Sequence, residues 1–222
     1  IDYINTFSVR EGIENYDVEG IDTESAFMDR RRIGAIVSYI LEHFDQKTKR
    51  SSSYELKDQR VSGFNSLLAT SSIKAARAYY REFERQQEDL PSDKRRSVGI
   101  IFSYAPNDEA PGTGLLAEES MDPSALSHDD RAFLDDAIAT YNDRFGTNFG
   151  TDASGFENYY EHLSKALTEK RIDLVIVVDM FLTGFDSKTL NTLWVDKNLH
   201  AHGLIQAFSR TNRILNSVKT YG

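Results

Sequence analysis

The chain has 222 residues, of which 40% are hydrophobic and 27% are charged, and its net charge at pH 7 is −9. This length predicts one large domain or a domain with appendages, and 13 Phe with 11 Tyr suffice for a substantial core. The absence of cysteine excludes disulfides, thiolate metal sites and a thiol nucleophile, and favours a reducing compartment. No apolar run approaches the ~20 residues that a membrane-spanning helix needs.

The negative charge is concentrated in one segment. Residues 107–143 contain ten acidic residues and one basic residue, Arg131, which accounts for the whole net charge. We expect the surrounding acidic insertion, residues 107–150, to contact a partner subunit or domain rather than DNA, because its charge repels phosphates. The rest of the surface can still carry a basic patch that faces DNA.

The first part of the chain, residues 1–62, is predicted to be an N-terminal appendage and linker. A strand is predicted from Tyr3 to Val9, and apolar residues at three- and four-residue spacing predict an amphipathic helix from Met28 to Phe44. The basic, serine-rich stretch from Lys47 to Arg60 is typical of a connector or hinge. Because the chain begins at Ile1 rather than Met, we expect it to be a piece of a longer protein.

Residues 63–222 alternate between apolar runs and helical patterns. The predicted strands are Phe64–Ala69, Val98–Tyr104, Leu174–Val178 and Leu190–Val195. The predicted helices are Ile73–Glu88, Asp129–Phe145, Phe156–Arg171 and His202–Ile214. Hydroxyls in Thr70-Ser71-Ser72 and at Ser127 offer helix N-caps. The alternation predicts an α/β fold, a parallel sheet with helices on both faces, and the continuously apolar run at Leu174 predicts a strand that is covered on both sides.

The segment Gln206-Ala207-Phe208-Ser209-Arg210-Thr211-Asn212-Arg213 is the first candidate for chemistry. Arg210 and Arg213 are three residues apart in a predicted helix, so both project from one face, with Gln206 one turn earlier. Guanidinium groups present a fixed fork of donors that matches phosphate oxygens, and such a pair can deliver positive charge to a transferring phosphoryl group. On spacing alone, a solvated basic end of a helix explains the pattern better, since short motifs recur by chance.

A second candidate follows the buried strand at Leu174. Gly184 permits close backbone approach, Asp186 suits a ribose hydroxyl, and Thr183 is a short donor suited to a phosphate. A strand-to-loop turn whose Asp residues cap local backbone explains this stretch equally well by itself.

Together these segments resemble the second RecA-like domain of superfamily-two helicases and translocases. Thr183-Gly184-Phe185-Asp186 falls at motif V, Gln206-x-x-Ser209-Arg210-x-x-Arg213 at motif VI, and Phe64–Ser72 resembles the motif IV strand and its turn. The run from Asp179 to Arg213 is similar to the motor (restriction) subunit of type I restriction-modification enzymes. Ile40–Phe44, Ala69–Ile73 and Gly155–Tyr160 also resemble that subunit, so the resemblance covers nearly the whole chain. Ser209 stands where many helicases have Gly, a small-for-small change.

The resemblance implies a RecA-like domain over residues 63–222 and a role for each matched residue. Arg210 and Arg213 would be arginine fingers that stabilise charge on the γ-phosphate of ATP, and Gln206 would lie near that phosphate. Asp186 and Gly184 would contact the nucleotide sugar or couple the ATP site to DNA. Hydrogen bonds to the phosphates of one DNA strand would come from Thr70, Ser71, Ser72 and Thr183, without reading sequence.

The chain contains no Gly-x-x-x-x-Gly-Lys-Ser/Thr motif, so it has no P-loop to hold the β- and γ-phosphates. The resemblance therefore implies that ATP and Mg²⁺ are held mainly by the first RecA-like domain of the same subunit, outside this chain. The expected protein is an ATP-dependent double-stranded DNA translocase and type I site-specific deoxyribonuclease of the bacterial or archaeal cytoplasm. Methyltransferase and specificity subunits are the expected partners, no membrane is involved, and the fragment alone is expected to be inactive.

Two alternatives stay open. The chain is either the same lobe of another superfamily-two helicase, or a non-catalytic RecA-like module that binds nucleic acid. Weaker candidates are His200-Ala201-His202 as a metal site, which lacks a third ligand, and Glu55-x-Lys57 or Glu169-Lys170 as nuclease motifs. His128-Asp129-Asp130 is better explained as the start of a helix. An aromatic group could stack bases, although core packing is favoured: Tyr79, Tyr80, Phe83, Tyr159 and Tyr160.

Overall fold

The computed structural model describes residues 27–102, 126–178, 180–181 and 185–197, with the single positions 209, 211 and 215. Its helices are α2 (Arg30–Lys47), α3 (Ile73–Gln87), α4 (His128–Phe145) and α5 (Ala153–Thr168). Its strands are β1 (Ser53–Leu56), β2 (Gln59–Ser62), β3 (Asn65–Thr70), β4 (Val98–Ile101), β5 (Leu174–Val177) and β6 (Leu190–Asp196). The strand predicted from Tyr3 to Val9 lies outside the described residues, as does most of the helix predicted from His202 to Ile214.

Four strands form one parallel sheet in the order β4-β5-β3-β6. The central strand β5 pairs with β3 through Leu67 and Val175 and with β4 through Ile100 and Ile176. All four of its residues are buried, because helices cover both faces of the sheet. This arrangement confirms the predicted α/β fold with a parallel, RecA-like sheet.

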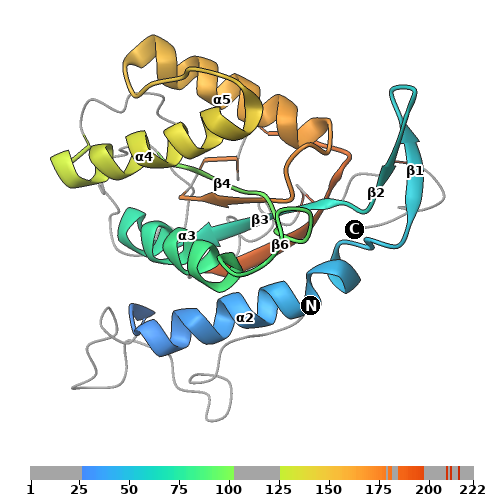
Figure 1. Ribbon diagram of the computed structural model, residues 1–222, viewed down its shortest axis with the longest axis horizontal. Helices are drawn as coiled ribbons and strands as arrows, with labels where there is room; N and C mark the ends of the chain where they lie inside the picture. Colours follow the sequence, from blue (N-terminus) through green and yellow to red (C-terminus); the bar gives the residue numbers. More distant parts are fainter. Residues whose placement is uncertain are drawn as a thin grey trace.

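The helices form a layer on each face of the sheet. Figure 1 shows α5 on one side and α3 with α2 on the other. The connection through α3 runs from β3 outward to β4, whereas the connection through α4 and α5 runs from β4 back to β5. Because crossovers between parallel strands are right-handed, connections in opposite directions place their helices on opposite faces. None of the helices in the described ranges is long and apolar enough to cross a lipid bilayer.

The helix boundaries follow from side-chain caps. Ser72 accepts a hydrogen bond from the Ala75 backbone N–H at 3.1 Å, and Ser127 accepts one from Asp130 at 3.2 Å. Gly146 ends α4 in the left-handed conformation (φ 66°), which glycine adopts without steric cost. The cap predicted within Thr70-Ser71-Ser72 is therefore confirmed and falls on Ser72, the cap predicted at Ser127 is confirmed, and His128 begins a helix as expected.

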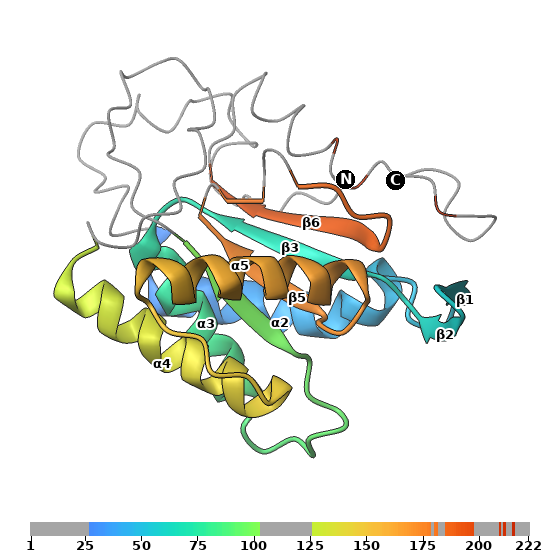
Figure 2. The same cartoon turned by 90° about the horizontal axis from the view of Figure 1, so that it is seen from above.

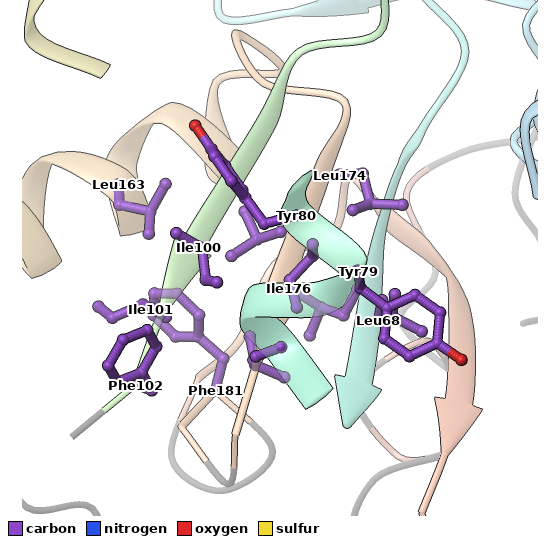
Figure 3. Close-up of a cluster of buried hydrophobic side chains, with 14 of the residues drawn as sticks. Leu68, Tyr79, Tyr80, Ile100, Ile101, Phe102, Leu163, Leu174, Ile176 and Phe181 are labelled. Carbon is purple, nitrogen blue, oxygen red and sulfur yellow. The ribbon is translucent and has the colours of Figure 1, made fainter. Parts of the chain in front are cut away.

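The core lies between the sheet and its helices, and aromatic residues fill much of it. Figure 3 shows the rings of Tyr79 and Tyr80 leaving α3 in different directions, with Tyr79 toward β6. Tyr80 contacts Phe133 of α4 edge-on, with ring centroids 5.7 Å apart. Tyr159 of α5 is buried and donates to the carbonyl oxygen of Ile100 at 2.7 Å. These side chains pack the core, as favoured from the sequence, rather than facing solvent where bases could stack.

The connector predicted from Lys47 to Arg60 is wrong over its second half. Strands β1 and β2 form an antiparallel hairpin, which projects from the sheet in Figure 1. Lys57 and Asp58 form its two-residue turn with φ angles of 47° and 64°, as in a type I′ turn. Tyr54 anchors the hairpin, because its buried ring stacks on Phe64 with centroids 4.8 Å apart.

The helix α2, predicted as part of an appendage, packs against α3. The amide of Gln86 donates to the carbonyl oxygen of Gly34 at 2.9 Å, and Ser38 donates to Gln86 at 3.0 Å. The buried residues of α2 belong to the same core as the sheet: Ile33, Ile36, Val37, Ile40 and Phe44. A domain boundary at residue 62 stays a prediction, although α2 and the residues after it share this core.

Candidate functional site

The carboxyl edge of the sheet is the candidate site. Because the four strands are parallel, β3, β4, β5 and β6 all end at this edge, which is where open α/β sheets bind ligands. Thr70 ends β3 and lies opposite Asp196, the last residue of β6. In Figure 2 the arrowheads of β3 and β6 point toward this edge.

The three hydroxyls after β3 are in different environments. Thr70 is fully buried, and its hydroxyl donates to the carbonyl oxygen of Val177 at 3.2 Å, which joins β3 to β5. Ser72 is partly buried and caps α3. Ser71, between them, is exposed. These three residues are all predicted to contact DNA phosphates. Ser71 is the one presented to solvent, whereas Thr70 and Ser72 hold the turn in place.

Asp196 is the centre of a polar cluster that sequence reasoning missed. Its carboxylate accepts a two-pronged ion pair from Arg32 of α2, one prong being 3.1 Å from Nη1, and a 2.6 Å hydrogen bond from the Tyr79 hydroxyl. Burial, together with the charge and the hydrogen bond of Asp196, raises the pKa of Tyr79 far above its ordinary value. The cluster ties α2 and α3 to the end of β6. Arg32 and Asp196 are separated by 164 residues in the sequence, so no local pattern could have revealed the pair.

The loop after β5 is anchored by aromatic side chains. Phe181 is fully buried, stacks on Tyr160 of α5 with centroids 5.0 Å apart, and packs 4.6 Å from Phe185. Its φ of 62° is rare for a bulky residue, and such conformations concentrate at functional sites. Asp186, the predicted nucleotide contact, is exposed directly after the buried Phe185. The carboxylate of Asp186 is thus exposed next to a buried aromatic side chain.

Several predicted site residues lie outside the described part of the structure. These residues are Thr183, Gly184, Gln206, Arg210 and Arg213. Within the same segment, Ser209 is exposed and Thr211 is buried. The structure therefore places Thr70, Ser71, Ser72 and Asp186, and the roles of all nine predicted residues stay predictions.

The structure gives no support to the weaker candidates, the metal site and the nuclease motifs, among the residues it describes. Within the described residues there is no group of three His, Asp or Glu side chains placed to hold a metal ion, and His200-Ala201-His202 lies outside them. Lys57 pairs with Glu169 at 3.6 Å, and Lys170 pairs with Asp173 at 3.1 Å. Lys170 is thus held in a buried ion pair, whereas the pair of Lys57, whose side chain is 72% exposed, lies at the surface.

The opposite, amino edge of the sheet has its own polar centre at Asp173. This buried carboxylate contacts Arg50 at 2.5 Å and Lys170 at 3.1 Å, and accepts from the backbone N–H of Ser97 at 3.0 Å. Burial opposes its ionisation, but the charge of Lys170, the Ser97 hydrogen bond and Arg50 outweigh it and hold the pKa of Asp173 well below its usual range. Asp173 thereby joins the strand β5 to the segments before β1 and β4.

Comparison with known proteins identifies the family. Residues 62–222 match the T1R_D3-like family, type I restriction enzyme subunit R domain 3. A type I restriction enzyme endonuclease subunit of Staphylococcus aureus is 37% identical over 228 residues, which cover 100% of this chain and 22% of that protein. The corresponding subunit of Staphylococcus saprophyticus is also 37% identical, over 226 residues with the same coverage. A putative N-terminal part of such a subunit from Mycoplasma pneumoniae is 72% identical over 43 residues, 19% of this chain and 11% of that protein.

The chain spans about a fifth of the length of the Staphylococcus relatives it matches, since it covers 22% of each. The family match begins at Ser62, the last residue of β2, covers the whole parallel sheet and its connecting helices, and includes every predicted site residue. The chain therefore belongs to the family of type I restriction enzyme R subunits, with its domain-3-like part at residues 62–222.

Proposed function

We propose that this chain is the second motor domain of an ATP-dependent double-stranded DNA translocase, the restriction subunit of a type I restriction enzyme. The observation that carries the proposal is the match of residues 62–222 to domain 3 of that subunit, which includes Gln206-x-x-Ser209-Arg210-x-x-Arg213. The names of the relatives, endonuclease subunits of type I restriction enzymes, support it.

The donor set suits a phosphoryl group. Arg210 and Arg213 provide guanidinium forks, and Gln206 provides an amide, so each can donate to phosphate oxygens without a proton transfer. The chain has no P-loop and this set contains no carboxylate, which is why we assign Mg²⁺ and most of the ATP contacts to the first RecA-like domain of the same subunit. When bound, ATP supplies the energy of γ-phosphate transfer to water. The two arginines stabilise charge developing on that phosphate.

The carboxyl edge supports the DNA part of the proposal. Ser71 is an exposed hydroxyl at the start of α3, where backbone N–H groups and the helix dipole favour a phosphate. Thr183 would add a donor, and Asp186, with Gly184, would couple the nucleotide to DNA. We propose that movement of this edge against the first RecA-like domain displaces the phosphates that Ser71 contacts.

In this proposal the complete protein works in a complex. It would associate with methyltransferase and specificity subunits on double-stranded DNA, in the cytoplasm of a bacterium or archaeon. Nuclease residues and the P-loop would belong to other parts of the subunit. The chain alone is accordingly expected to hydrolyse no ATP and to cleave no DNA.

The substitution Arg210→Ala in the full-length subunit tests the proposal. DNA-stimulated ATP turnover should fall by about 10³–10⁵, the value of an arginine finger, while DNA affinity is largely retained. Arg60→Ala, which removes an exposed arginine of β2, is a matched control and should leave turnover unchanged. Unchanged ATP turnover in Arg210→Ala would refute the proposed role.

The same variant separates the proposal from the binding-module alternative. A non-catalytic module would lose DNA affinity in Arg210→Ala, with a shallower dependence on salt, and the wild-type subunit would show no ATP turnover to lose. ATP turnover with DNA unwinding rather than translocation would instead favour another superfamily-two helicase.

A further inference from the structure

Two cavities lie next to each other at the amino edge of the sheet. The first, about 370 Å³, is lined by Arg50, Ser97 and Lys170 among others, and the second, about 570 Å³, by Val98 and Ile172 among others. Both are therefore at the starts of β4 and β5. Arg144, at the end of α4, lines both cavities. Figure 2 shows the end of α4 on the same side of the sheet as the chain that leads into β4.

The walls of both cavities are predominantly basic. The first has four basic residues and one acidic residue, Asp173, and the second has five basic residues and two acidic residues, Glu84 and Glu88. We call this surface the amino-edge tract and define it by six residues. They are Arg50, Lys170 and Arg171 in the first cavity, Arg81 and Arg95 in the second, and the shared Arg144.

Several arginines of the amino-edge tract are not held in ion pairs within the described residues. Arg171 pairs with Glu169 at 3.0 Å, and two further arginines of the second cavity are paired with acids. Arg81, Arg95 and Arg144, by contrast, form no ion pair with any residue in the described part of the chain. Walls with an excess of one sign of charge focus the field and raise the local concentration of counter-ions.

Three of these charges are also held in place before any ligand arrives. The side chain of Lys170 is 5% exposed and held by Asp173. Arg95 donates to the carbonyl oxygens of Leu90 at 2.7 Å and Glu88 at 2.5 Å, and Arg81 lies over the ring of Phe133. The side chains at these three positions are already restricted in the free protein, so less conformational entropy is lost when a ligand binds.

We propose that the amino-edge tract binds the phosphodiester backbone of double-stranded DNA. Arginine forks match phosphate oxygens, and two adjoining cavities that share Arg144 suit a chain of regularly spaced anions better than one isolated anion. DNA is the polyanion that a restriction endonuclease subunit meets. This contact is additional to the one at the carboxyl edge, since six residues of β3 separate the two edges by roughly 20 Å.

The amino-edge tract gives two parts of the acidic insertion, residues 107–150, different roles. Its acids precede Arg144 along the chain, and Arg144 itself occupies the last turn of α4. The helix can thus face a protein partner with its acidic positions and contact DNA with its end. The tract needs no ATP-driven movement, so this inference stands separately from the motor proposal.

The test is DNA binding by the full-length subunit without nucleotide. Affinity for a short duplex of arbitrary sequence is measured over a range of KCl concentrations for wild type, Arg144→Glu and Arg81→Glu/Arg144→Glu. We expect Arg144→Glu to weaken binding by about 10-fold at low salt. The plot of log affinity against log salt should become shallower by about 1 for each phosphate that the variant no longer neutralises. The double variant should show larger changes in both affinity and slope.

Two further variants control for charge and folding. Lys165→Glu makes the same charge change at an exposed position of α5 that lines neither cavity, and it should bind as wild type does. Arg144→Gln removes the charge without adding an acid, and it should shift affinity and slope in the same direction by a smaller amount. Because Arg144 is exposed and contributes nothing to the core, near-ultraviolet circular dichroism should show folded protein in each case.

Three results would overturn the inference. Arg144→Glu and the double variant could keep the wild-type affinity and salt slope. Lys165→Glu could lose as much affinity as Arg144→Glu, which would mean a diffuse surface field. Assembly or thermal stability could fall with DNA affinity unchanged, which would assign the tract to an acidic protein surface. Because ATP plays no part in the measurement, the DNA affinities can be interpreted even if the motor proposal fails.

Discussion

The two edges of the sheet use polar side chains in opposite ways. At the carboxyl edge, Thr70 and Ser72 bond to the backbone, and Asp196 is matched by Arg32. At the amino edge, Asp173 is matched by two cations, and further arginines stand without an ion pair among the described residues. The carboxyl edge is thus a rigid platform whose predicted chemical groups come from the loops after β5 and β6. The amino edge presents its charge from the ends of helices and strands.

Replacing Asp173 should have the largest effect on stability. Asp173→Asn leaves the buried Lys170 and its neighbour Arg50 without a counter-charge, so we expect a loss of about 3–5 kcal/mol in the free energy of unfolding. Urea unfolding followed by the fluorescence of Trp194, the single tryptophan, measures it. Glu169→Gln removes an acid that is more exposed and should cost at most about 1 kcal/mol. Equal losses in the two variants would contradict a buried charge centre.

The difference in stability between wild type and Asp173→Asn should also depend on pH. The folded-state pKa of Asp173 lies below the unfolded value, so its contribution is complete above the ordinary carboxyl pKa of about 3.9 and is lost as the pH falls through the folded value. The gap in stability between wild type and Asp173→Asn should therefore narrow as the pH is lowered below about 4. A constant gap down to strongly acidic pH would show that the ion pairs do not cause it.

The equivalent change at the carboxyl edge should cost less. Asp196→Asn weakens the pair with Arg32 and the hydrogen bond from Tyr79, for which we expect about 1.5–3 kcal/mol. Tyr79→Phe removes only the hydroxyl and should cost about 1 kcal/mol. A double-mutant cycle between the two positions should show coupling, because both changes act on one hydrogen bond. Additive losses would argue against the cluster.

Substitution of the two serines after β3 distinguishes a structural role from a DNA contact at the carboxyl edge. Ser72→Ala removes the cap of α3 and should lower stability by about 1 kcal/mol. Ser71→Ala removes an exposed hydroxyl and should change stability by less than about 0.5 kcal/mol. In the full subunit, Ser71→Ala should weaken DNA binding more than Ser72→Ala does. The reverse order would move the proposed phosphate contact from Ser71 to Ser72.

Most of the sheet and its helices could be predicted from the sequence, because periodicity and capping are local signals. The buried run at Leu174 and the cap at Ser127 are examples. The hairpin of β1 and β2 was missed because its turn is Lys57-Asp58. The Asn-Gly and Asp-Gly pairs that signal type I′ turns combine a first residue that tolerates positive φ with a glycine, whereas Lys does not favour positive φ and Asp58 stands in the glycine position.

The polar centres of both edges were missed for a different reason. Arg32 and Asp196 are 164 residues apart, and Arg50 and Asp173 are 123 apart. Which partners meet depends on the strand order, and alternating strands and helices predict a parallel sheet without specifying that order. The amino-edge tract is likewise assembled from α3, the end of α4 and the segments before β1, β4 and β5. Its local signal is also hidden, since Arg144 directly follows the acidic stretch of residues 107–143.

The smallest expected effect is a shift in the titration of His162, which reports the potential at the amino edge. Burial lowers the pKa of His162, and the charges of Arg171 and Lys165 lower it further. The unfolded chain therefore takes up a proton more readily, and stability should fall slightly as the pH drops through about 6.5, the ordinary value for histidine. His162→Gln should remove that slope in the urea experiment.

The same histidine can tell whether the amino-edge tract holds phosphates. Arg171 lines the first cavity, so phosphates bound there would offset its charge, and the pKa of His162 should rise toward its ordinary value when DNA is added. Arg171→Gln should raise it without DNA, for the same reason. Nuclear magnetic resonance titration of the His162 ring measures both shifts. A DNA-dependent rise that Arg144→Glu abolishes would place the phosphates at the tract, and a pKa indifferent to DNA would leave the carboxyl edge as the site of contact.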